Sequence, residues 1–150
     1  MKAKPSEQPR TLAEKLQHLF ASVKPAGRAE YSNHEVATAI EEAGGPTISA
    51  TYVWQLRKGL RTNPTLNHLE ALAGFFGVPT SYFLDEAKAE EIDSQLELLA
   101  ALRHSEVQAI ALRASGVSSE GLNAIVTMLD HVRRVEGLPP ARKTNSSLTD

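Results

Sequence analysis

Residues 49–64 hold the side chains of this sequence that are best suited to chemistry with a partner. Helical spacing over Ala50–Lys58 turns Val53 and Leu56 to one face of a short helix. The opposite face carries small, hydroxyl, aromatic and amide side chains: Ala50, Thr51, Trp54 and Gln55. A glutamine can pair bidentately with an adenine edge, and a threonine can bond a base or touch a thymine methyl. We therefore expect these four residues to read bases in the major groove of DNA.

A second polar set lies at the two ends of this helix and in the turn that follows it. We expect it to contact phosphates, which fix register without reading sequence: Ser49, Tyr52, Lys58, Arg61 and Asn63. No Asp or Glu occurs between Ala43 and Leu69. For contact with phosphates, the charge of this segment matters more than the net charge of −2 of the whole chain, because charge interactions are screened within about 10 Å. The segment 85–137 carries five cations against ten acids, so DNA would repel it and we expect it to have another role.

The rest of the chain predicts the helices that position this face. Apolar residues recur at three- and four-residue steps and no run alternates as a strand would, so the fold class is all-α. Capping patterns predict where the helices begin. The predicted caps are Thr11, Ser32, Ser49, Thr65 and Ser118. A short helix is expected near Tyr82, and Ile48 is placed to plug the core from the turn before Ser49.

Composition and spacing divide the chain into four parts. We predict a flexible arm (1–10), a five-helix repressor-like helix-turn-helix domain (11–85), a helical dimerisation domain (86–137) and a disordered tail (138–150). Within 86–137 the helical spacing of apolar residues is interrupted near His104. The last helix of this segment has an apolar stripe that we expect at a homodimer interface: Leu122, Ile125, Val126, Leu129 and Val132. The alternative is that this stripe packs within one chain.

Several function classes find no support in the sequence. There is no cysteine, no glycine-rich phosphate loop and no nucleophile elbow, and the five histidines are scattered without metal-ligand spacing. We therefore expect no enzyme activity, metal, cofactor or small-molecule ligand. The N-terminus lacks the apolar core of a signal peptide, and no apolar run has the roughly 20 residues that span a bilayer. These features favour a cytoplasmic protein without a membrane partner.

Three side-chain interpretations remain open at this level. Trp54 is either exposed on the reading face or partly buried against the helix after Ser32. Arg57 either faces DNA or forms a structural ion pair with an acid such as Glu35 or Glu41. The acidic run 86–103 is most simply a solvated helix face.

The pattern resembles the Cro/repressor-type (XRE) helix-turn-helix family over residues 11–84. The shared features are a capped recognition helix, an aliphatic-x-x-Leu-x-x-Gly run, a basic turn, a proline, and a Leu-rich helix ending in Gly-Val. They occur at Val53 to Gly59, Arg61, Pro64, Leu66 to Leu72 and Gly77-Val78. The resemblance implies a five-helix domain that inserts helix 50–58 into the major groove.

Shorter strings are similar to the actinobacterial EspR group. They are Ser49 to Tyr52, Gln55 to Arg57, Gly59 to Pro64 and the Val-Arg-Arg-Val-Glu-Gly run that ends at Gly137. This resemblance implies a nucleoid-associated regulator with an extra C-terminal dimerisation domain. Departures from many XRE members are the aromatic Trp54 on the reading face and the long turn at Gly44-Gly45-Pro46.

Together these observations predict a transcriptional regulator or nucleoid-associated protein that binds double-stranded DNA as a homodimer, sequence-specific or sequence-tolerant. Assembly beyond the dimer on DNA is an open option. The alternative, from another class, is a protein-interaction adaptor that keeps the fold without binding DNA.

Overall fold

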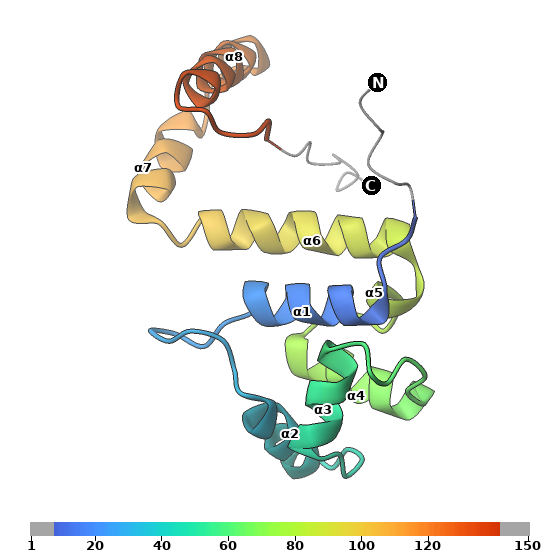
Figure 1. The fold of residues 1–150 in the computed structure, drawn as a ribbon. Helices are drawn as coiled ribbons and strands as arrows, with labels where there is room; N and C mark the ends of the chain where they lie inside the picture. The colour runs from blue at the N-terminus through green and yellow to red at the C-terminus, as the bar shows by residue number, and fades with distance from the viewer. Residues whose placement is uncertain (1–7, 142–150) are drawn as a thin grey trace. The chain divides into compact units, whose positions relative to one another are not determined.

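The computed structural model describes residues 8–141, and all the regular structure in this range is helical (Figure 1). This confirms the all-α prediction. The helices are α1 (Leu12–Ser22), α2 (Asn33–Glu42), α3 (Ala50–Arg57), α4 (Leu66–Phe76), α5 (Ser81–Leu84), α6 (Glu86–Ala101), α7 (Ser105–Ala114) and α8 (Ser119–Val135). The break predicted near His104 lies between α6 and α7. The predicted arm falls outside the described residues over 1–7, and the predicted tail does so over 142–150.

The chain divides into two compact units, one up to Leu96 and the other from Glu97. The division lies inside α6, beyond the domain boundary that we expected after Asp85. The first half of α6 therefore belongs to the helix-turn-helix unit. Ala89 and Ile92 of α6 are buried in the same core as the side chains of α1 to α5.

The five helices with a predicted cap, α1 to α4 and α8, begin directly after that residue. Ser32 and Glu35 form a complete capping box at the start of α2, with the Ser32 hydroxyl accepting from the Glu35 backbone and the Glu35 carboxylate accepting from the Ser32 backbone. At the start of α3, the Ser49 hydroxyl accepts from the backbone N–H of Tyr52 at 3.0 Å. Each such cap satisfies a backbone donor that has no partner within its helix, so these starts are fixed locally.

Two glycines end the helices of the helix-turn-helix pair. Gly59 has φ +73°, a left-handed conformation that allows the N–H groups of Leu60 and Arg61 to bond the carbonyl of Gln55. After α2, a Cβ on Gly45 would lie 2.9 Å from the carbonyl oxygen of Ile40, so only glycine fits this close approach.

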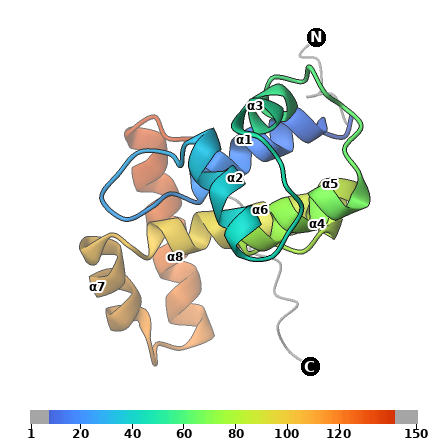
Figure 2. The ribbon, with the colours of Figure 1, turned by 90° about the horizontal axis from the view of Figure 1, so that it is seen from below.

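The core of the first unit is made by the side chains that face inward from α1 to α5. The largest fully buried ones are Leu16, Leu19, Phe20, Val36, Val53, Leu56, Leu72 and Tyr82. Ile48, in the turn before α3, is also buried, as predicted. Helix α3 contacts α1 and α2, and α2 also contacts α4 (Figure 2). Helix α3 is therefore supported along one side by the core.

The second unit has a different character. Helices α7 and α8 are well formed, and the predicted cap Ser118 accepts from Gly121 N–H at 3.2 Å, but no residue of either helix is buried. No helix among residues 8–141 combines the length and apolar character needed to cross a membrane.

Candidate nucleic-acid interface

Helix α3 is held by its apolar side and shows its polar side outward. Val53 and Leu56 are fully buried, and burying each such side chain contributes about 1.5–3 kcal/mol. Of the residues that we expected to read bases, Thr51 is exposed, Trp54 keeps 43% of its surface exposed, and Ala50 and Gln55 are half-buried. Trp54 is thus among the exposed residues, although more than half of its surface is covered.

Four of the five residues expected to contact phosphates are exposed. They are Ser49, Lys58, Arg61 and Asn63, at the two ends of α3 and in the turn after it. The Ser49 hydroxyl caps α3, so its acceptor function is used within the protein while its O–H remains a donor.

Tyr52 is the fifth residue of that set, and it lies in a different environment. Its ring is partly buried, packs edge-on against the His68 ring at 5.1 Å, and its hydroxyl lies 3.1 Å from His68 Nδ1. The pair joins α3 to the first turn of α4. Sequence reasoning missed this pair, because a separation of 16 residues carries no local signal.

Arg57, at the end of α3, is hydrogen-bonded to other side chains of the same unit. Its Nε donates to Gln17 Oε1 at 2.6 Å, its Nη1 to Asn33 Oδ1 at 2.9 Å, and its Nη2 to Glu30 Oε2 at 2.9 Å. The ion pair expected with Glu35 or Glu41 is thus made with Glu30. The two partners named from the sequence, Glu35 and Glu41, were wrong. Both are on α2, whereas Glu30 lies in the loop before that helix.

Glu35 is paired with Arg28 of that same loop. Arg28 Nη2 lies 2.6 Å from Glu35 Oε2, and this hydrogen-bonded guanidinium lowers the pKa of the carboxyl to about 2. The negative charge also lies in the first turn of α2, where the helix dipole favours it. The loop before α2 is therefore held at both Arg28 and Glu30.

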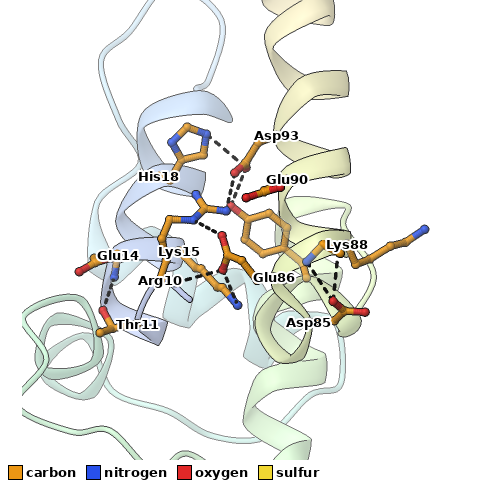
Figure 3. A network of polar contacts seen from close by, with 12 residues as sticks. Arg10, Thr11, Glu14, Lys15, His18, Asp85, Glu86, Lys88, Glu90 and Asp93 are labelled. Atoms are coloured by element: carbon orange, nitrogen blue, oxygen red, sulfur yellow. Dashed lines mark hydrogen bonds and ion pairs between the residues drawn. The ribbon is translucent and has the colours of Figure 1, made fainter. Parts of the chain in front are cut away.

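A polar network that sequence reasoning missed joins α1, α5 and α6 (Figure 3). Asp93 is only 2% exposed. Arg10 Nη2 lies 2.6 Å from its Oδ2, and the Tyr82 hydroxyl donates to its Oδ1 at 2.7 Å. His18 Nε2 also lies 3.2 Å from Oδ1. One signal was present in the sequence, because Asp93 stands four residues after Ala89 and next to Ile92, on the buried side of α6.

The start of α6 is fixed by a second part of the same network. Arg10 bonds Glu86 through both its backbone N–H, at 3.1 Å, and its Nε, at 2.9 Å. The buried Lys15 reaches the Phe83 carbonyl and Glu86, each at 3.4 Å. Desolvation opposes ionisation of Glu86, but the hydrogen bonds from Arg10 prevail and lower its pKa. Arg10 belongs to the segment expected to be a flexible arm, yet here it is tied to two residues of α6.

The apolar stripe of α8 is exposed along its length. Leu122, Val126, Leu129 and Val132 keep between 38% and 54% of their surfaces exposed, and Ile125 is half-buried. These residues recur at three- and four-residue steps, so they share one face of α8. Such a face is unusual for a side of a helix that remains in water.

The fold and this site define an all-helical protein built around a helix-turn-helix pair, α2 and α3, with two further helices, α7 and α8, after α6. No family model matches the chain. It is 40% identical over 128 residues to the nucleoid-associated protein EspR of Mycobacterium tuberculosis, strains CDC 1551 / Oshkosh and ATCC 25618 / H37Rv. The matched residues cover 85% of this chain and 96% of each relative, so the chain belongs to the EspR family.

Proposed function

We propose that this protein is a DNA-binding nucleoid-associated regulator of the Cro/repressor helix-turn-helix type, which acts at the nucleoid by inserting α3 into the major groove. The observation that carries the proposal is the division of α3 into two sides. Val53 and Leu56 are buried in the core, while Thr51 and Trp54 are exposed and Gln55 is half-buried. A helix anchored in this way can enter a groove without losing its own packing.

Thr51 and Gln55, one turn apart on α3, are the proposed hydrogen-bonding readers. Ala50 and Trp54 border them and supply apolar contact, which suits thymine methyl groups and sugars. Lys58, Arg61 and Asn63 are exposed at the end of α3 and in the turn after it, which supports a role beside the reading face. In our proposal these three side chains, with Ser49 and Tyr52 at the other end, bind the phosphates that border the groove.

The named relative supports the proposal from a separate direction. EspR is described as nucleoid-associated, and this chain spans nearly all of its length at 40% identity. A nucleoid-associated protein is surrounded by DNA, which is a polyanion. The exposed cations after α3 and the absence of acids between Ala43 and Leu69 suit such a partner.

We further propose that α8 forms a homodimer through the face that carries Leu122, Ile125, Val126, Leu129 and Val132. A helix of 17 residues is about 25 Å long, which is enough for several turns of side chains to interdigitate with a second copy. A dimer would bring two copies of α3 to one DNA molecule. The second would bind at a high effective concentration, so affinity would rise without new contacts.

Binding to duplex DNA over a range of salt concentrations tests the proposed function. The full chain is titrated into fluorescein-labelled duplexes of random sequence, and the dissociation constant is read from anisotropy. We expect affinity to fall steeply as salt rises, because every phosphate that is neutralised releases counterions, with a slope of about −0.9 per phosphate. The absence of binding at low salt would refute the proposal and favour the adaptor alternative.

Sedimentation velocity tests the homodimer. We expect a dimer at micromolar concentration in the absence of DNA, because the α8 face is apolar and does not depend on phosphate. A monomer over this range would show that α8 has another use.

A further inference from the structure

We propose that Arg57 is a positioning residue for α3, which sets the angle at which the reading face meets DNA and does not itself contact phosphate. This inference rests on the proposed DNA-binding function and adds a role for a residue outside the reading face. It starts from the set of groups around one guanidinium at the C-terminal end of α3.

All three nitrogens of that guanidinium are engaged with different parts of the fold. Gln17 belongs to α1, Glu30 to the loop between α1 and α2, and Asn33 is the first residue of α2. A single side chain of α3 therefore joins the three segments that precede it. Arginine suits this task because its donors have a fixed planar geometry, which a lysine ammonium lacks.

The guanidinium also contacts the core. Its central carbon lies 3.8 Å from the centre of the Phe20 ring, in the geometry of a cation–π contact. Phe20 is fully buried and packs edge-on against Phe76 of α4 at 5.0 Å. Arg57 thus holds the end of α3 to the rigid centre of the domain.

This environment argues against a phosphate contact by Arg57. Only 13% of its side chain is exposed, whereas Lys58 and Arg61 beside it are exposed. Reaching a phosphate would require Arg57 to give up Glu30, its charge partner at 2.9 Å, together with the Phe20 ring. We infer that the charge of Arg57 is used within the protein and that α3 without it would lose a fixed end.

The chain contains one tryptophan, and it is well placed to report on this position. Trp54 lies three residues before Arg57, so the two side chains are neighbours on the helix surface. Because Trp54 is 43% exposed, its emission responds to small changes in how α3 lies against the domain. It gives a readout that does not depend on DNA.

The first test compares variants of Arg57 with one of Lys58 in the salt titration described above. For Arg57→Lys and Arg57→Gln we expect at least about tenfold weaker binding at every salt concentration, with the wild-type salt slope. For Lys58→Gln we expect a slope reduced by about 0.9, because one phosphate contact is lost. Wild-type affinity in Arg57→Lys, or a slope change in Arg57→Gln like that of Lys58→Gln, would overturn the proposal.

A second comparison separates positioning from simple electrostatics. Glu30→Ala removes a negative charge and also a partner of Arg57, whereas Glu42→Ala removes an exposed acid in the last turn of α2. If charge alone mattered, both changes would tighten binding to DNA. Positioning predicts that Glu30→Ala weakens it several-fold while Glu42→Ala leaves it equal or tighter. Equal tightening by both would contradict the role that we assign.

The third readout is the fluorescence of the free protein, in samples whose far-UV circular dichroism matches the wild type. We expect Arg57→Lys to shift the Trp54 emission to longer wavelength and to increase its quenching by acrylamide, while Arg61→Ala changes neither. Unchanged Trp54 emission in Arg57→Lys would refute positioning even if DNA binding fell. If the proposed DNA-binding function is wrong, the wild type itself binds no duplex. This outcome differs from failure of the positioning role, in which the wild type binds DNA.

Discussion

The guanidinium of Arg10 lies 2.6 Å from the carboxylate of Asp93, and this ion pair joins the residue before the cap of α1 to the middle of α6. Asp93 is buried and Arg10 is partly buried, so water screens the pair less than it would on the surface. The pair, with Tyr82 and Glu86, makes the first half of α6 part of the helix-turn-helix unit.

Replacing Asp93 should destabilise the helix-turn-helix unit. In Asp93→Ala, Arg10 and Tyr82 lose their shared acceptor, and breaking a buried ion pair by removing one partner costs about 3–5 kcal/mol. We expect the free energy of unfolding to fall by about 3 kcal/mol, since Arg10 retains some access to water. Urea unfolding followed by circular dichroism measures this. Glu90→Ala, an exposed acid of the same helix, is the control and should cost little.

Tyr82 should make the fold sensitive to alkaline pH. Burial, and then the hydrogen bond to Asp93, raise its pKa above the ordinary value of 10.0. The pKa of Tyr82 is higher in the folded state than in the unfolded state. The contribution of Tyr82 to the free energy of unfolding is therefore fully present below pH 10.0 and decreases as pH rises above it. Tyr82→Phe should be less stable at neutral pH, through the lost hydrogen bond, and should lack this alkaline decrease.

The expectation for Tyr82 is checked by measuring the free energy of unfolding of the wild type and of Tyr82→Phe at neutral and alkaline pH. The difference between wild type and Tyr82→Phe should stay constant up to about pH 9 and narrow beyond the phenol's ordinary pKa. A constant difference at all pH values would show that the phenol ionises equally easily in the folded chain.

Gln55 and Lys58 should differ in how they affect DNA binding. Gln55→Ala is expected to weaken binding at particular sequences by about 1–3 kcal/mol, because a bidentate base contact carries that much discrimination. Lys58→Ala, like Arg61→Ala, should weaken binding to all sequences. The two patterns are separated by selecting bound sites from a random duplex library and then measuring affinity for selected and unselected sequences. Equal losses from Gln55→Ala on every sequence would contradict base reading.

A charge on the apolar face of α8 should disrupt the homodimer. Leu129→Asp would place a carboxylate in the proposed interface, where burial without a partner costs several kcal/mol. We expect dimer affinity to fall about a hundredfold or more, since each 1.4 kcal/mol is a factor of ten. Thr127→Asp lies on the opposite face of α8 and should leave the dimer intact. Sedimentation equilibrium of the two variants gives the comparison.

The features that depend on neighbours along the chain could be predicted from the amino-acid sequence. The caps at Ser32 and Ser49, the break near His104 and the inward side of α3 at Val53 and Leu56 all agree with the structure. Capping acts over three residues and helical periodicity over four, so the information is complete within a short window.

Which polar side chains contact one another depends on the tertiary fold. It joined Arg57 to Glu30, Tyr52 to His68 and Arg10 to Asp93. Such pairs are remote in the sequence, and each charged or polar group has many chemically equivalent partners within reach of an unfolded chain. The packing of the apolar core brings particular backbones together, and the choice of partner follows from that geometry and not from local spacing.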